Sequence, residues 1–390
     1  MSKPSDVDRY FQEIDRSREM EVELGKLVRE NSFTNSREGG HRVGEILLQS
    51  TFAMEGLYVE RRESTGFASH LIFRSEDGPN LAMGEGVALV GHLDTVFPPG
   101  TFEGMVEDGI KLRGPGVLDM KGGLVVVATA LRAIATTVGL GAIKPVLGVI
   151  VSDEEVGSPE GQRVIADAAS GASEALVFEA GRERDAIILE RKGTGAVKLT
   201  ARGVSAHAGV SHEVGRNAIW ALSRWIDRAQ ALTRYELGTT INVGKIAGGI
   251  GKNTVPDFAE AEIDLRFVTK ELAEGLVAAL ALIAKEVERE LPGTSLELEG
   301  GIARLPLERT TESEQLAARY AVFAKASGLG GEFAGRIGGG SDASTTSALG
   351  IPTIDGLGPR GLGFHTKDEW IDRTSLVPKA WALARFLSSR

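Results

Sequence analysis

The stretch Val87–Pro98, VALVGHLDTVFP, decides the fold class of this chain. Its apolar residues run without interruption and stop at His92, a pattern typical of a strand buried on both faces that ends at the rim of a sheet. Because side chains alternate along a strand, His92 and Asp94 point to the same side. Asp94 can therefore orient the imidazole of His92 or bind a metal beside it.

Similar apolar runs alternate with helical patterns between Tyr58 and Arg191. Two of these runs, 145–152 and 175–178, predict further strands of the same buried sheet. The α/β character returns after Arg304, where the periodicity predicts a helix near Glu312–Ala326 and a final one near Pro378–Ser388. We therefore expect a discontinuous α/β domain made of residues 1–193 and 304–390.

The segment between these two parts, residues 194–303, has a different pattern. Strands with alternating polar and apolar residues, such as 258–268, are separated by helical stripes at 216–232 and 270–291. The resulting order, β-α-β-β-α-β, predicts an inserted ferredoxin-like α+β domain. Because its strands alternate, one face of its sheet is expected to be open to solvent.

Composition narrows the function. The 390 residues carry a net charge of −10, which argues against nucleic acid as a partner because phosphate binding needs a basic surface. The chain has no cysteine, so any metal must be held by His, Asp and Glu, a ligand set that suits zinc, manganese or cobalt.

One stretch, Gly122–Ile143, has about the length and apolarity of a membrane span. Arg132 lies at its centre and small or β-branched residues dominate it, so a buried core helix is expected instead. The first 21 residues are polar and lack the apolar core of a signal peptide. We expect a cytoplasmic protein with no membrane partner.

Several other acidic or imidazole side chains follow apolar strands or lie in glycine-rich loops. Adjacent glutamates at a strand end point in different directions, so one can bind a metal while the other faces the substrate as a base. Ligand sites in α/β sheets gather at the carboxyl ends of strands. The candidates that join His92 are Asp119 in RGPGVLDMKGG, Asp153, Glu154 and Glu155 in SDEEVGS, Glu179 in ALVFEA, and His365 in GLGFHTKDEW.

Such a set suits a pair of divalent ions about 3.5–4 Å apart, which need a bridging carboxylate, a bridging water and terminal His and Glu ligands. The ions lower the pKa of that water toward about 7. A glutamate that binds neither ion can take the proton of the water and later protonate a leaving amine.

The motifs HLDTVFP, GPGVLDMKGG, SDEEVGS, FEA, SAHAG, GGGSDAS and GFHTKDEW, in this order, resemble those of the M20 metallopeptidases, and most closely those of the carboxypeptidase G2 type. Residues before 85 contribute little to the likeness. The resemblance implies a zinc-exopeptidase-like, mixed-sheet catalytic domain with an inserted dimerisation or lid domain. It implies that two Zn²⁺ ions, replaceable by Co²⁺ or Mn²⁺, share Asp119, whose following peptide bond is cis. The implied roles are His92 and Glu179 on one ion, Glu155 and His365 on the other, Glu154 as general acid and base, and Asp94 as the partner that orients His92.

The same resemblance implies a homodimer. His207 of SAHAG would reach into the partner's site and stabilise the oxyanion. Asn253 and Arg266 match substrate-facing positions. Arg304 matches the arginine that grips the free carboxylate of the substrate, although the surrounding GIARLPLE follows the family pattern only loosely.

Other interpretations have less support. The GGIGKNT around Lys252 lacks the spacing of a phosphate loop. The GGGSDAS around Ser341 could be a serine nucleophile with His365 as its base, but Ala343 replaces the second glycine and the carboxylates stay unexplained. Within the metal-dependent class, release of a C-terminal amino acid, possibly glutamate, from a peptide or N-acyl amino acid is expected. An acetylornithine deacetylase-like or desuccinylase-like deacylase, or a dipeptidase, is the alternative.

Overall fold

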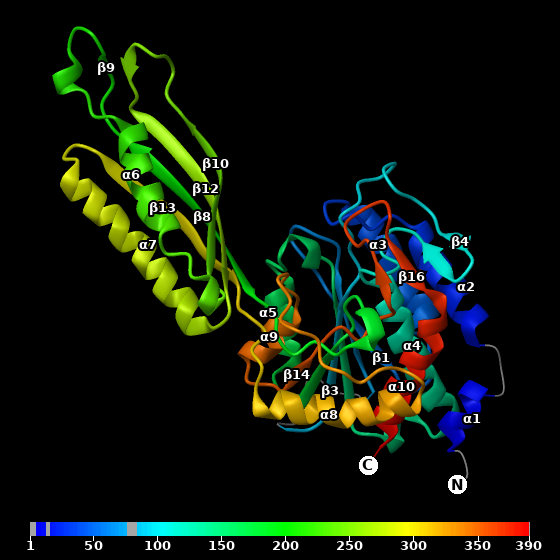
Figure 1. The fold of residues 1–390 in the computed structure, drawn as a ribbon. Coiled ribbons are helices and arrows are strands. Elements are labelled where there is room, and N and C mark those ends of the chain that lie inside the picture. Colours follow the sequence, from blue (N-terminus) through cyan, green and yellow to red (C-terminus); the bar gives the residue numbers. More distant parts are fainter. Residues whose placement is uncertain (1–4, 13–15, 76–83, 390) are drawn as a thin grey trace. The chain divides into compact units, whose positions relative to one another are not determined.

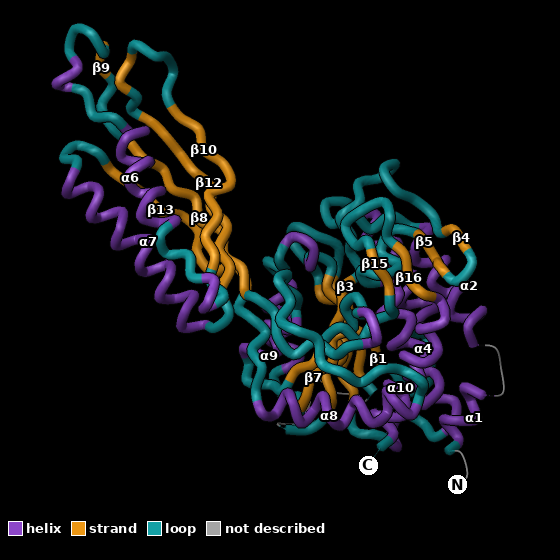
Figure 2. Tube along the Cα trace, viewed as in Figure 1, coloured by secondary structure: helices purple, strands orange, loops and turns teal. Residues whose placement is uncertain are grey.

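The run Val87–His92 forms strand β3 in the computed structural model, which describes residues 5–12, 16–75 and 84–389. The chain divides into two units, which are described separately below. The first contains residues 1–190, 309–336 and 341–390, and the second contains residues 191–308 and 337–340. Figure 2 shows that each unit combines helices and strands, as the prediction of an α/β domain with an α+β insertion requires.

Strand β3 lies near the centre of a six-stranded mixed sheet with the order β1-β2-β6-β3-β7-β14. It runs parallel to β6 and to β7, while β2 runs antiparallel to β6. All six residues of β3 and of β6 are buried, so both faces of the sheet are covered. The sheet strands are β1 (Tyr58–Arg62), β2 (His70–Arg74), β3, β6 (Val146–Val151), β7 (Glu174–Val177) and β14 (Thr353–Ile354).

Helices pack against the strands of this sheet (Figure 1). Helix α4 contacts β3, α2 and α10, and helix α5 contacts β6 and α9. A second sheet with the order β15-β16-β5-β4 carries loops that reach the candidate site. The helices are α1 (Asp6–Gln12), α2 (Arg16–Arg29), α3 (Arg37–Ile46), α4 (Lys121–Thr137), α5 (Gly161–Ala169), α8 (Thr311–Ala326), α9 (Ala343–Ala348) and α10 (Leu376–Ser388), and the strands of the second sheet are β4 (Val106–Asp108), β5 (Lys111–Arg113), β15 (Gly361–Leu362) and β16 (Trp370–Asp372).

The apolar stretch after Lys121 forms a core helix, as predicted. Helix α4 is buried along most of its length, and the half-buried Arg132 donates a hydrogen bond to the carbonyl oxygen of Thr51, 2.8 Å away. In the part of the chain that the structure describes, no helix is both long enough and apolar enough to span a bilayer. The first 21 residues, in which no signal peptide was expected, include residues 1–4 and 13–15, which lie outside the described residues.

The second unit is an antiparallel four-stranded sheet with the order β10-β12-β8-β13. Helices α6 and α7 cover one face, where alternate residues of β8 and β12 are buried (Figure 1). The predicted order β-α-β-β-α-β is confirmed. Its elements are β8 (Gly193–Arg202), β9 (Ala206–His207), α6 (Ala218–Gln230), β10 (Thr240–Gly248), β11 (Thr254–Val255), β12 (Phe258–Phe267), α7 (Lys270–Glu290) and β13 (Ser295–Arg304).

Short helices complete both units. They are η1 (Leu47–Thr51), η2 (Leu140–Ala142), η3 (Glu154–Val156), η4 (Glu183–Asp185), η5 (His212–Val214), η6 (Tyr235–Leu237) and η7 (Arg373–Ser375). Helix η3 follows β6 and carries both glutamates of the SDEEVGS motif.

Candidate metal centre

Three parallel neighbours of the main sheet deliver acidic or imidazole side chains to one edge. Strand β3 ends at His92, β6 leads into Glu154 and Glu155 on η3, and Glu179 follows β7 by two residues. Because β3 is parallel to β6 and to β7, their carboxyl ends meet at the same edge. Two loops of the same unit bring Asp119 and His365 to this edge.

The carboxylate of Asp119 lies between the two imidazoles. Its Oδ1 is 3.2 Å from Nε2 of His92, and its Oδ2 is 3.3 Å from Nε2 of His365. Nε2 of His92 is also 3.8 Å from Oε1 of Glu179, and Nε2 of His365 is 2.9 Å from Oε2 of Glu155. The five predicted ligands are thus brought together as two sets of three that share Asp119.

Glu154 belongs to the same cluster. Ligand-type atoms of His92, Glu154 and Glu179 all lie within 4.8 Å of one another, and so do those of His92, Asp119 and Glu155. Imidazole nitrogens and carboxylate oxygens are the donors that zinc, manganese and cobalt bind. The donor set therefore fits divalent cations, and the carboxylate of Glu154 lies within 4.8 Å of the ligand-type atoms of His92 and Glu179.

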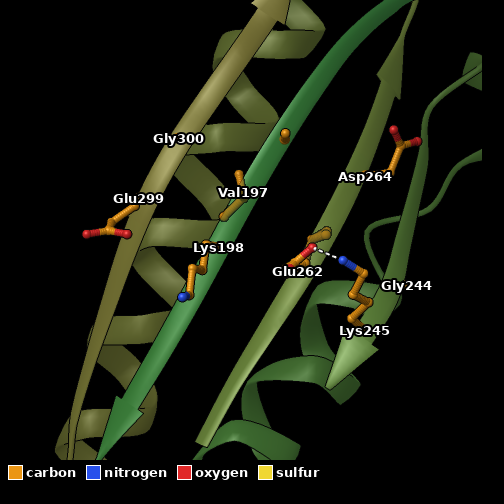
Figure 3. Close-up of a pocket in the computed structure, with 10 residues that line it drawn as sticks. Val197, Lys198, Gly244, Lys245, Glu262, Asp264, Glu299 and Gly300 are labelled. Carbon is orange, nitrogen blue, oxygen red and sulfur yellow. Dashed lines mark hydrogen bonds and ion pairs between the residues drawn. The ribbon is translucent and has the colours of Figure 1, made fainter. Parts of the chain in front are cut away.

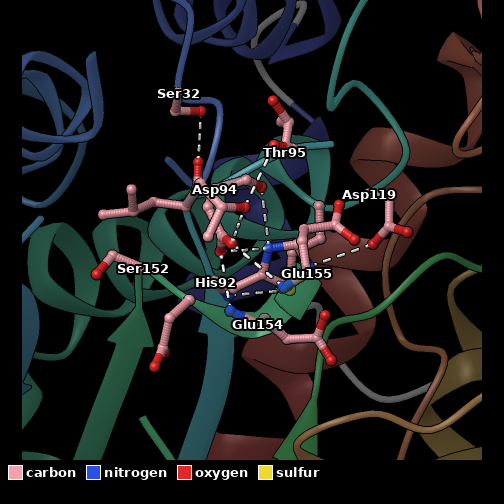
Figure 4. A network of polar contacts seen from close by, with 12 residues as sticks. Ser32, His92, Asp94, Thr95, Asp119, Ser152, Glu154 and Glu155 are labelled. Carbon is pink, nitrogen blue, oxygen red and sulfur yellow. Dashed lines mark hydrogen bonds and ion pairs between the residues drawn. The ribbon is translucent and has the colours of Figure 1, made fainter. Parts of the chain in front are cut away.

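Asp94 contacts His92 and also holds other parts of the site in place. Its Oδ1 lies 3.3 Å from Nδ1 of His92 and accepts a hydrogen bond from the backbone N–H of Glu154 at 3.2 Å. Its Oδ2 accepts from the backbone N–H of Glu155 at 3.2 Å and from the hydroxyl of Thr34 at 2.7 Å. This buried carboxylate therefore ties strand β3 to the turn that carries both glutamates (Figure 4).

Burial and close charges shift the protonation of the cluster. Burial opposes a charged His92, but its contacts with Asp119 and Asp94 raise the pKa of this imidazole well above its usual value. Burial raises the pKa of Glu179 strongly and that of Glu155 to about 8. Contacts with Asp119 and Glu155 raise the pKa of His365 to about 10. These groups therefore hold protons that a bound cation has to displace.

The peptide bond from Asp119 to Met120 is cis, which confirms the expectation from the family resemblance. The loop before it is held by Glu369, a fully buried residue of the GFHTKDEW segment whose carboxylate accepts hydrogen bonds from three of its backbone N–H groups. Sequence reasoning did not single out Glu369.

Thr34 was missed as well. The segment around it pairs with the chain just after β3, because a bridge joins Phe33 to Thr95 and the hydroxyl of Ser32 donates to the carbonyl oxygen of Leu93 at 2.7 Å. Nothing in the turn-rich sequence NSFTNSREGG indicates this contact. Residues before 85 therefore contribute to the site although they contribute little to the family motifs.

The predicted substrate-facing residues lie in the second unit. His207 is exposed on β9, and its Nδ1 accepts the backbone N–H of Gly209 at 3.2 Å, which leaves the ring proton on Nε2. Asn253 is exposed beside it, with its carbonyl oxygen bonded to the N–H of Ala208 at 2.9 Å. Arg304 is buried at the other end of the sheet, opposite Thr194.

Arg266 is already engaged. Its guanidinium donates to both carboxylate oxygens of Asp264, at 2.9 and 3.1 Å, on the face of the sheet that the helices leave open. A hollow of about 560 Å³ lies on this face (Figure 3). Its charged side chains are largely paired, as in the 2.9 Å contact between Lys245 and Glu262. None of the residues that line it is a candidate ligand or base.

Ser341 is not arranged as a nucleophile. It is buried, and its hydroxyl donates to Oδ2 of Asp355 at 2.7 Å. His365, its expected base, instead faces Asp119 and Glu155. The geometry therefore argues against the serine interpretation.

Comparisons with known proteins find related chains and folds. A family model described as a peptidase dimerisation domain matches residues 189–292. The chain is 30% identical to succinyl-diaminopimelate desuccinylase of Cereibacter sphaeroides over 90% of this chain and 93% of that protein. It is 27% identical to carboxypeptidase G2 of Pseudomonas sp. over 93% of this chain and 87% of that protein.

Solved structures share the fold. An aminopeptidase from Bacillus cereus superposes with a TM-score of 0.77 at 22% identity, covering 95% of this chain and 98% of the other. An M20 family metallo-carboxypeptidase from Sulfolobus solfataricus gives a TM-score of 0.72 at 16% identity, with the same coverage of 95% and 98%.

Proposed function

The chain belongs to the M20 family of hydrolases, and from that premise we propose that it binds two divalent cations, zinc in the first place, and cleaves an amide bond to release a C-terminal amino acid from a small peptide or N-acyl amino acid. The observation that carries the proposal is the position of Asp119. Each of its carboxylate oxygens faces a different imidazole, 3.2 Å away in one case and 3.3 Å in the other. A carboxylate with this arrangement is suited to bridge two cations.

The residues divide the chemistry between them. His92 and Glu179 would complete one cation site and Glu155 and His365 the other. When bound, the cations would polarise the amide carbonyl and lower the pKa of a water molecule. Glu154 would take the proton of the attacking water and deliver it to the leaving amine. Asp94, through its bonds to the backbone of η3, would keep that carboxylate in place.

The dimensions of the second unit support a partner subunit in catalysis. Arg266 and Arg304 both lie opposite Thr194, at one end of β8. Arg202, at the other end of β8, is eight residues after Thr194. His207 lies still further away, on β9, which extends past that end of β8 (Figure 1). At about 3.3 Å per residue this separation exceeds about 26 Å, whereas a dipeptide spans about 7 Å. A substrate gripped by Arg304 would therefore meet the His207 of a second copy.

The adjacent glutamates offer a matched test. Glu154→Gln should keep both cations and lose about 100- to 10,000-fold in rate, because the base is gone and the proposed ligands stay. Glu155→Gln should instead weaken cation binding. Metal content measured on dialysed protein, together with turnover, separates the two roles. A Glu154→Gln enzyme with nearly full activity, or with lost metal, would contradict the assignment of Glu154 as the base.

The role of His207 has its own experiment. His207→Ala should lower turnover without changing metal content. Mixing it with Glu154→Gln should restore part of the activity, since a hybrid dimer pairs the intact Glu154 of one subunit with the intact His207 of the other. Absence of rescue, in a mixture shown to contain hybrid dimers, would contradict a residue shared between subunits.

A deacylase of the desuccinylase kind is the second candidate, favoured by the 30% identity to the Cereibacter sphaeroides protein. The two functions differ in which half of the substrate is recognised. A panel that varies the acyl group at a fixed C-terminal residue, and then the reverse, separates them. Selectivity for the C-terminal residue supports the carboxypeptidase-like function, and selectivity for a succinyl or acetyl group supports the deacylase.

A further inference from the structure

The loop that carries Asp119 has no regular structure of its own. It joins β5, which ends at Arg113, to α4, which begins at Lys121. Its position depends on what its backbone groups contact, because a loop without a helix or strand ladder must satisfy its N–H and C=O groups elsewhere.

Glu369 supplies those contacts. Its Oε1 accepts hydrogen bonds from the backbone N–H of Leu118 at 2.8 Å and of Asp119 at 3.1 Å, and its Oε2 accepts from that of Gly116 at 3.2 Å. The side chain is completely buried. Three N–H groups converge on one carboxylate only while the loop keeps this conformation. This side chain therefore adds to the loop's own backbone bonds, from Val117 to Gly114 and from Lys121 to Gly116, in holding the backbone up to Asp119.

The same residue is connected to the other imidazole. Glu369 lies four positions after His365, and its backbone N–H donates to the carbonyl oxygen of Thr366 at 3.2 Å. Its own carbonyl oxygen accepts from the N–H of Gly114 at 3.3 Å. Glu369 thus joins the loop of His365 to the loop of Asp119, the two residues whose side-chain atoms lie 3.3 Å apart.

We propose that Glu369 is a positioning residue that holds the Asp119 loop in its cation-binding conformation before any cation arrives. A carboxylate preorganised between two imidazoles binds cations without first paying the entropy of ordering its loop. This inference rests on the proposed function, since it assigns Glu369 to the cation site described above.

The test is Glu369→Gln, which keeps the size of the side chain but turns an amide N–H₂ toward backbone donors. The expected result is a 10- to 100-fold loss of Zn²⁺ and Co²⁺ affinity in competition with a chelator, with a changed visible absorption of the Co²⁺ form. Glu21→Gln is the matched control, because Glu21 is a buried carboxylate whose ion pairs with Arg18 and Arg373 include no candidate ligand. Its cation affinity should stay unchanged.

The parent protein gives a second readout if Glu369→Gln does not fold. Amide hydrogen exchange at Gly116, Leu118 and Asp119 should be slow in the cation-free protein and change little when Zn²⁺ is added. Free exchange that becomes protected only with Zn²⁺ would overturn the proposal, and so would a folded Glu369→Gln protein with the affinity and Co²⁺ spectrum of the parent. If the parent binds no Zn²⁺ or Co²⁺, the proposed function itself fails. The slow exchange expected of the cation-free loop still tests whether Glu369 holds that loop.

Discussion

Replacing Asp94 with asparagine should weaken the metal centre without removing any proposed ligand. Each carboxylate oxygen of Asp94 faces two donor groups. Oδ1 faces the N–H of Glu154 and Nδ1 of His92, and Oδ2 faces the N–H of Glu155 and the hydroxyl of Thr34. The amide group of asparagine places N–H₂ where one oxygen was. At the Oδ1 position two contacts become donor against donor, and at the Oδ2 position one does, because the hydroxyl of Thr34 can rotate to accept.

The size of the effect follows from these contacts. A hydrogen bond to a charged group contributes about 1.5–3 kcal/mol, so loss of one or two amounts to about 1.5–6 kcal/mol in the local arrangement. Part of this cost should appear as a cation affinity about 10- to 100-fold weaker, which equals about 1.4–2.7 kcal/mol. The remainder should appear as a lower free energy of unfolding.

The assay measures Zn²⁺ affinity by chelator competition and unfolding by urea, for the parent and for Asp94→Asn. Thr34→Val is the matched variant, because it removes only the hydroxyl bond to the carboxylate and should cost about 1.5–3 kcal/mol. The double variant should lose less than the sum of the two single losses, since both act on one carboxylate. Unchanged Zn²⁺ affinity in a folded Asp94→Asn protein would refute the reasoning.

Three further outcomes are expected. Zn²⁺ binding at pH 7 should release protons, and the affinity for Zn²⁺ should increase as the pH rises. The reason is that Glu155, with a pKa of about 8, and His365, with a pKa of about 10, hold protons that the cation displaces. Calorimetry in buffers of different ionisation heat measures the proton release, and its absence would contradict the prediction. Gly148→Ala should cost at least about 1–3 kcal/mol, because its added Cβ would lie 1.7 Å from the Phe73 ring, whereas Gly141→Ala, with open space around it, should unfold thermally like the parent. Burial lowers the pKa of Lys379 from 10.5 to about 8, so the unfolded state binds more protons than the folded state between pH 8 and pH 10.5. The free energy of unfolding should therefore rise by up to about 3 kcal/mol as the pH rises through this range. Lys379→Met should remove this rise when unfolding by urea is measured at several pH values, and an unchanged rise would contradict the prediction.

The sequence was sufficient for the features that depend on local pattern. His92 and Glu179 follow uninterrupted apolar strands, and the parallel pairing of those strands brings their ends together. Glu155 follows the third such strand. The glycines around Asp119 indicated a loop in which the backbone can approach closely. Each of these signals lies within about ten residues of the side chain that it predicts.

The supports of the ligands left no such signal. The hydroxyl of Thr34 meets Asp94 across 60 positions of the chain, and Glu369 meets the backbone of Asp119 across 250. Contacts between residues so far apart in the sequence depend on the tertiary fold, so no periodicity or spacing in the sequence predicts them. The contribution of the N-terminal segment to the site was therefore not predicted.

The pairing of Arg266 was within reach of the sequence. Residues two apart on a strand lie on the same face, so Asp264 was bound to lie beside it. The observed bidentate contact follows from that alternation. A substrate carboxylate would have to compete with Asp264 for this guanidinium.

The central claim, two cations that share Asp119, is tested most directly by anomalous diffraction from crystals grown with Zn²⁺. The account predicts two peaks about 3.5–4 Å apart at the zinc edge, one on each side of the Asp119 carboxylate. One peak should lie next to His92 and Glu179, and the other next to Glu155 and His365. A single peak, or peaks that do not contact Asp119, would contradict it.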